Sequence, residues 1–165
     1  MFNIGDRVVY PSQGIGVIDL IEEKEFNGKT ESYYKIHLLN NRMNLTLPFS
    51  RVEPSKIRLV SDNNKIDDTL KNITRYTTCD DELDNSNFKG RMGVNAIKVK
   101  NGTLEDYLEV ICNLSQVKSK YRLNSSEKDV LNNTKKFVVE EICQSMNIPQ
   151  NEAIAMLDEA IDCFN

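Results

Sequence analysis

The chain has 165 residues, of which 39% are hydrophobic, and a formal net charge of −4. This length is enough for one ordinary domain or two small ones, and the acidic total argues against a protein that coats nucleic acid indiscriminately. No apolar run approaches the roughly 18 residues of a membrane span and no signal-peptide pattern is present, so we expect a soluble, cytoplasmic protein.

The first 60 residues predict short β-strands. Residues 7–10 form the first, a turn-rich segment follows, and a β-branched run over 15–21 forms the second. The pair Asn27-Gly28 predicts a hairpin turn, because both central residues of a type I′ turn need positive φ. A third strand over 32–39 therefore follows this turn.

Two further strands complete the predicted sheet. Apolar and polar residues alternate over 34–38 and again over 43–47, which places Tyr34 inward and His37 outward. Residues 57–60 could supply a fifth strand. Five strands of this size predict a small curled barrel.

After Val60 the pattern changes. Polar residues 61–65 indicate a domain boundary, and we assign domains to 1–62 and 63–165. Helical periodicity predicts helices near 104–114, 125–146 and 149–164, with weaker ones near 66–77 and 89–99. Thr103, with Asp106 three positions on, supplies a plausible cap at the start of the first of these helices. The predicted fold class is therefore a two-domain α+β chain with a bundle of about five α-helices.

A basic window interrupts the acidic second domain. From Ser86 to Leu104 there is no acidic residue, and the window carries Lys89, Arg91, Lys98 and Lys100. Phe88 at the start of a helix could press its ring against a base step while the cations hold phosphates. The alternative is that Phe88 packs into the bundle and the cations are a solvated face, and spacing alone favours this alternative.

Two glycines fall within the same helical stretch. Gly90 and Gly93 each cost about 1 kcal/mol relative to alanine inside a helix. They indicate either a close approach to this backbone or a loose helix.

Catalytic and metal-binding patterns are weak. The only histidine, His37, lies in a domain without cysteine, so a Cys-His nucleophile pair is not expected. The segment from Gly14 to Gly16 lacks the rest of a phosphate-binding loop. The four cysteines form no Cys-x-x-Cys pair and are best explained as reduced core thiols. We therefore expect no enzyme, cofactor or metal.

Three segments resemble one family. Residues 5–18, GDRVVYPSQGIGVI, resemble the opening of CarD/CdnL-type regulators and of the polymerase-interacting domain of the transcription-repair coupling factor. Residues 87–91, NFKGR, are similar to the family's Asn-Trp-x-x-Arg segment, and residues 123–128, LNSSEK, to the segment before its penultimate long helix. The resemblance covers essentially the whole chain.

For the first domain, the resemblance implies a Tudor-like barrel that docks on the β subunit of bacterial RNA polymerase, partly by pairing sheet edges. The family pattern places Lys24 and Phe26 at basic and apolar interface positions. Thr46 stands where the family often has arginine.

For the second domain, the resemblance implies contact with promoter DNA at the upstream edge of the bubble. Phe88 replaces the family's tryptophan wedge, and Lys89, Arg91 and Lys128 would neutralise phosphates. The implied protein is a global transcription regulator that stabilises the open complex, is nucleoid-associated through polymerase, and has no small-molecule ligand and no sequence-specific DNA binding. The alternative is an adaptor that docks on polymerase without DNA contact.

Overall fold

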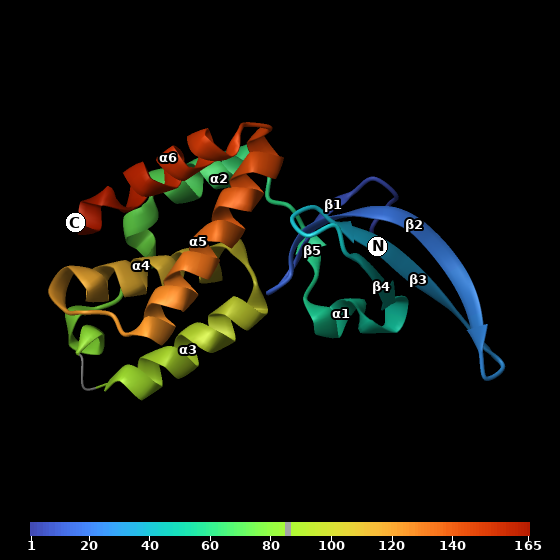
Figure 1. Ribbon diagram of the computed structural model, residues 1–165, viewed down its shortest axis with the longest axis horizontal. Helices are drawn as coiled ribbons and strands as arrows, with labels where there is room; N and C mark the ends of the chain where they lie inside the picture. Colours follow the sequence, from blue (N-terminus) through green and yellow to red (C-terminus); the bar gives the residue numbers. More distant parts are fainter. Residues whose placement is uncertain (85–86) are drawn as a thin grey trace. The chain divides into compact units, whose positions relative to one another are not determined.

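The computed structural model describes residues 1–84 and 87–165. The chain divides into two compact units, Met1–Val60 and Ser61–Asn165 (Figure 1). The first is a β-sheet and the second a set of helices, so the chain is a two-domain α+β protein. Ser86, the first residue of the acid-free window, lies outside the described residues.

The first unit is one antiparallel sheet of five strands. They are β1 (Arg7–Tyr10), β2 (Gly14–Phe26), β3 (Lys29–Leu38), β4 (Asn44–Pro48) and β5 (Arg58–Leu59). Their order across the sheet is β4-β3-β2-β1-β5. All five predicted strands are present, and β2 and β3 run further toward the hairpin turn than predicted.

The sheet is open, so the predicted barrel closure is wrong. Strands β4 and β5 form the two edges and do not pair with each other in the described chain. Two features explain this. Strand β5 has only two residues, and the connection from β4 to β5 is taken up by a 3-10 helix, Phe49–Arg51, and by α1 (Val52–Ser55). The sequence patterns did not predict α1.

The core of the first unit lies against one face of the sheet. Its central residue is Tyr34, which is almost fully buried and stacks on Phe49 with ring centroids 4.3 Å apart. Gly16 on β2 is required by close packing, because a Cβ there would lie 2.5 Å from Ile36 Cγ2 and 3.0 Å from the His37 carbonyl oxygen. Burial of each large apolar side chain contributes about 1.5–3 kcal/mol.

A β-bulge divides β2 into two parts. Ile18 pairs with Ile36 and Leu20 pairs with Lys35, so Asp19 is an extra residue on β2. Because side chains alternate along a strand, one extra residue reverses which face the following side chains occupy. Beyond Asp19, the even-numbered residues of β2 therefore lie on the face opposite the core.

The second unit contains five α-helices among its described residues. They are α2 (Asn63–Lys71), α3 (Phe88–Asn101), α4 (Leu104–Lys120), α5 (Ser125–Met146) and α6 (Gln150–Ile161). A 3-10 helix, Ile73–Tyr76, replaces the end of the helix predicted over 66–77. Together with α1, the described chain has six α-helices, one more than predicted.

Side-chain caps set the beginnings of α4 and α5. The Thr103 hydroxyl accepts a hydrogen bond from the Asp106 amide at 3.0 Å, as the sequence predicted. Helix α5 begins with a capping box, in which Asn124 and Glu127 each accept from the other's backbone amide. The start of each helix is therefore set by side chains only three positions apart in the sequence.

The cysteines only partly fit the predicted core positions. Cys112 is buried, and this burial raises the pKa of its thiol to about 12. Cys79 and Cys163 are exposed, so for them the core prediction is wrong. None of the helices in the described chain is both long enough and apolar enough to cross a bilayer.

Candidate functional site

The strand register brings Lys24, Phe26 and Thr46 onto one face of the sheet. Lys24 pairs with Glu31 and Phe26 with Lys29 across the β2–β3 hairpin, and Thr46 on β4 pairs with Lys35 on β3. Directly paired residues share a face, and alternation extends that face along each strand. We call this surface the outer face, and it consists of Leu20, Glu22, Lys24, Phe26, Lys29, Glu31, Tyr33, Lys35 and Thr46.

Charged groups on the outer face form a short network. Lys35 Nζ lies 2.6 Å from Glu22 Oε1, and Lys24 Nζ lies 3.4 Å from Glu22 Oε2. The hydrogen bond from Lys35, with a smaller contribution from Lys24, lowers the pKa of the Glu22 carboxyl. Lys24 also lies 5.6 Å from the centre of the Tyr33 ring. Lys24 is therefore held above the sheet with about half of its side chain exposed.

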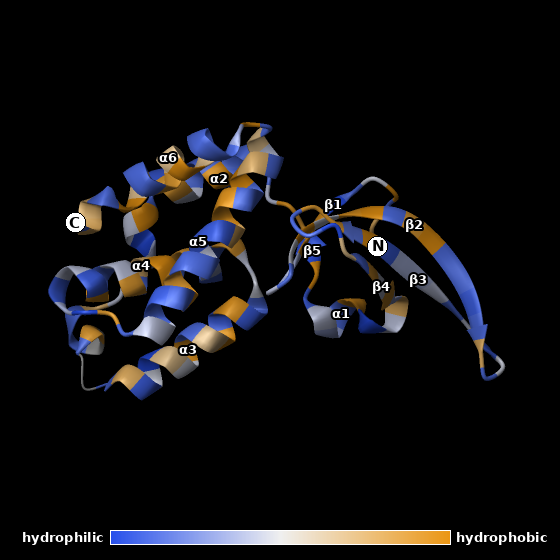
Figure 2. Cartoon of the chain, in the orientation of Figure 1, coloured by the Kyte–Doolittle hydropathy of each residue, from blue (hydrophilic) through white to orange (hydrophobic). Residues whose placement is uncertain are grey.

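Phe26 is the most prominent apolar group of this face. It is 72% exposed and comes directly before the turn formed by Asn27 and Gly28, which both have positive φ as predicted. In Figure 2 the far end of the β2–β3 hairpin is mainly hydrophilic, apart from the hydrophobic residue at the turn. An exposed aromatic side chain on a hydrophilic arm is a suitable anchor for a protein partner.

The second group of predicted site residues lies at the start of α3. Phe88 is the first residue of α3 and is half-buried, whereas Lys89 is exposed. The Asn87 side chain folds over the next turn, because a Cβ on Gly90 would lie 2.5 Å from Asn87 Oδ1. The close approach predicted at Gly90 is therefore made by the chain's own asparagine. Gly93, in contrast, faces open space.

The structure places Arg91, which the family resemblance predicted to neutralise phosphate, in a buried ion pair. Its Nη2 and Nε donate to Glu127 Oε1 at 2.6 and 3.0 Å, and its Nη1 donates to the Asp84 carbonyl oxygen at 3.1 Å. The Arg91 and Glu127 side chains are only 3% and 2% exposed. Arg91 therefore ties the start of α3 to the capping box of α5.

The three lysines of α3 and Lys128 of α5 differ in their surroundings. Lys98 Nζ pairs with Glu109 at 2.7 Å. Within the described part of the chain, Lys89, Lys100 and Lys128 make no salt bridge, and all three are exposed. Lys128 directly follows Glu127 in α5, and Phe88 lies in the same helix as Arg91. The Arg91–Glu127 pair therefore connects the helix that carries Lys128 to the helix that carries Phe88. An external phosphate could therefore reach each of these three lysines.

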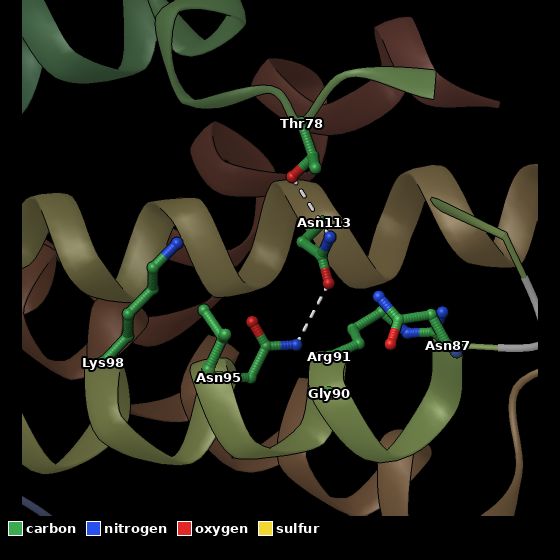
Figure 3. A pocket seen from close by; sticks show the side chains of 8 residues that line it. Thr78, Asn87, Gly90, Arg91, Asn95, Lys98 and Asn113 are labelled. Atoms are coloured by element: carbon green, nitrogen blue, oxygen red, sulfur yellow. Dashed lines mark hydrogen bonds between the residues drawn. The ribbon is translucent and has the colours of Figure 1, made fainter. Parts of the chain in front are cut away.

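A polar pocket of about 370 Å³ lies between α3 and α4. Asn95 Nδ2 donates to Asn113 Oδ1 at 3.0 Å, and Asn113 Nδ2 donates to Thr78 Oγ1 at 3.1 Å (Figure 3). Arg91 and Lys98 also line it. The sequence patterns did not reveal this pocket, because its residues come from segments far apart in the chain.

Comparison with known families gives a match in each unit. Residues 2–61 match the CarD-like/TRCF RID domain, and residues 73–158 match the CarD C-terminal domain. The chain belongs to the CarD family. Members of this CarD/CdnL type are RNA polymerase-binding transcription regulators and are in general not enzymes.

One relative of similar length agrees with the CarD assignment. The chain is 35% identical over 142 residues to YdeB of Bacillus subtilis, whose name describes it as a transcription factor, covering 86% of this chain and 90% of YdeB. A solved structure, CdnLNt from Myxococcus xanthus, is 38% identical, with a TM-score of 0.30, over 32% of this chain and 75% of that one.

Proposed function

We propose that the chain stabilises the open promoter complex by holding the β subunit of RNA polymerase with the outer face of its sheet and the upstream edge of the DNA bubble with the start of α3. The CarD assignment makes polymerase the partner. The observation that carries the DNA half is the position of Phe88 on an acid-free helix whose first turn is fixed by Arg91.

The mechanism needs differential affinity for two states of DNA. A ring inserted at a distorted base step contacts open DNA better than intact duplex. A ligand that prefers one state shifts the equilibrium toward it. No bond is made or broken, so the proposed protein is not an enzyme and takes no cofactor.

Phosphate contacts would come from Lys89 and Lys128 rather than from Arg91. Both lysines are exposed, and the Arg91–Glu127 pair keeps their helices together. Such contacts position the protein and make binding salt-dependent, but they do not read base sequence.

The wedge is tested by the lifetime of open complexes on one promoter. We expect Phe88→Ala to shorten the lifetime that the protein confers, and Phe88→Trp to lengthen it, because indole offers a larger ring. Ile97→Ala is the matched control, since Ile97 lies on the same helix and is 63% exposed. An unchanged lifetime with Phe88→Ala, while polymerase binding persists, refutes the wedge.

The docking surface is tested by a pull-down with the isolated polymerase β lobe. The double variant Lys24→Ala/Phe26→Ala is expected to lose binding. The control is Glu23→Ala/Glu25→Ala, which changes the same hairpin arm on the opposite face. If the Lys24→Ala/Phe26→Ala variant keeps its full binding to the β lobe, the outer face is not the docking surface.

The second candidate is an adaptor that docks on polymerase without touching DNA. The half-buried state of Phe88 and the net charge of −4 favour it. It predicts that Phe88→Ala and Lys128→Ala leave open-complex lifetime unchanged, so the same lifetime assay separates the two candidates.

A further inference from the structure

The pocket between α3 and α4 contains a hydrogen-bond acceptor, Asn95 Oδ1. Asn95 is 2% exposed and donates through Nδ2 to Asn113, and its Oδ1 accepts no hydrogen bond from the described residues. Figure 3 shows this oxygen on the side of the amide away from the Asn113 bond. Because this oxygen is an acceptor on a residue that lines the pocket, the pocket suits a ligand that donates a hydrogen bond.

Arg91 contributes a flat wall to the pocket. Three of its five N–H groups donate to Glu127 and to the Asp84 carbonyl oxygen, which fixes the orientation of the guanidinium plane. The face of such a plane stacks well on aromatic rings. Val94 adds an apolar wall beside it.

An anion does not fit this pocket. Lys98, at its edge, is paired with Glu109, and Arg91 is paired with Glu127, so both lining cations are already neutralised. The pocket therefore suits a flat, neutral group with a donor at its edge. A volume of about 370 Å³ falls at the lower end of the range for small-molecule pockets, which run from roughly 300 to 1,000 Å³.

From these features we infer that the pocket receives one unpaired base from the edge of the DNA bubble, specifically a base with an exocyclic amino group. The inference rests on the proposed function, in which Phe88 opens the adjacent step. Asn87, which lines the pocket, directly precedes Phe88 in the chain. The amino group donates to Asn95 Oδ1 while the ring lies between Arg91 and Val94, as enzymes read extruded bases by edge hydrogen bonds and stacking.

The test uses open complexes of RNA polymerase, formed with and without the full chain, and measures the factor by which the chain extends their lifetime. Templates carry adenine, thymine or an abasic site at the first unpaired upstream position, on each strand in turn. On one of the two strands, adenine is expected to extend the open-complex lifetime by a factor at least about five times larger than the abasic site does. A five-fold difference corresponds to the lower end of the free energy that one stacked base contributes. Thymine, which lacks the amino group, is expected to fall between them.

Two variants localise the effect without touching the core. Val94→Phe narrows the pocket, and Val94 is 52% exposed, whereas Ile97→Phe adds the same ring to α3 outside the pocket. Val94→Phe should remove the advantage of adenine and Ile97→Phe should keep it. If the chain extends the open-complex lifetime equally on adenine and abasic templates, the inference about the pocket is refuted but the proposed function is not. If the chain extends the lifetime on no template, the proposed function itself is refuted.

Discussion

Replacing Arg91 with alanine should strongly destabilise the second unit. Arg91→Ala removes three hydrogen bonds and leaves the Glu127 carboxylate buried without its charge partner. Breaking a buried pair in this way costs about 3–5 kcal/mol. For a unit of this size, each kcal/mol of lost stability lowers Tm by roughly 4–8 °C. A loss of about 3 kcal/mol should therefore lower Tm by about 12 °C or more.

Scanning calorimetry of the full chain measures this shift. The matched variant is the double change Arg91→Met/Glu127→Leu, which removes both charges and refills the space. It should recover most of the lost stability, because a buried ion pair and an apolar pair of similar volume are often about equal. A single Arg91→Ala variant that melts within about 2 °C of the parent chain would refute the reasoning, since it would mean that water satisfies Glu127.

Three other expectations follow from local geometry. Gly16→Ala should destabilise the sheet by about 1–3 kcal/mol in chemical denaturation, because the added methyl overlaps packed neighbours. Cys112 should resist alkylation in the folded chain at pH 8 while exposed Cys163 reacts first, as mass spectrometry would show, because with a pKa of about 12 only about one Cys112 thiol in ten thousand is ionised. Lys35→Ala should raise the pKa of Glu22 toward its ordinary value in an NMR titration, and an unchanged pKa would show that the 2.6 Å contact does not persist in solution.

Local signals in the sequence predicted the elements well. The Asn27-Gly28 turn and the Thr103 cap were found because each depends on residues a few positions apart. Sheet closure was not predictable in the same way. It depends on whether β5 is long enough to meet β4, and the short segment over residues 57–60 does not show how many of its residues will pair.

The buried ion pair of Arg91 was not predicted because its partner is distant in the chain. Glu127 is 36 positions away, and a basic residue in an acid-free window gives no sign of it. The pocket was missed for a related reason. Asn95, Asn113 and Thr78 come together only through the packing of α3 and α4, and isolated asparagines in helical segments carry no pattern.

The extra residue at Asp19 has a consequence for comparing this chain with its relatives. Positions before Asp19 are matched correctly by counting forward from the Gly14 turn, but positions on the arm must be counted back from Asn27. A relative with one residue fewer here would still present the counterparts of Leu20 and Glu22 on the outer face, because these residues pair with Lys35 and Tyr33 of β3. An insertion or deletion at this single point therefore shifts the numbering of the arm by one position, while leaving both the surface of the arm and the core contacts of the sheet in place.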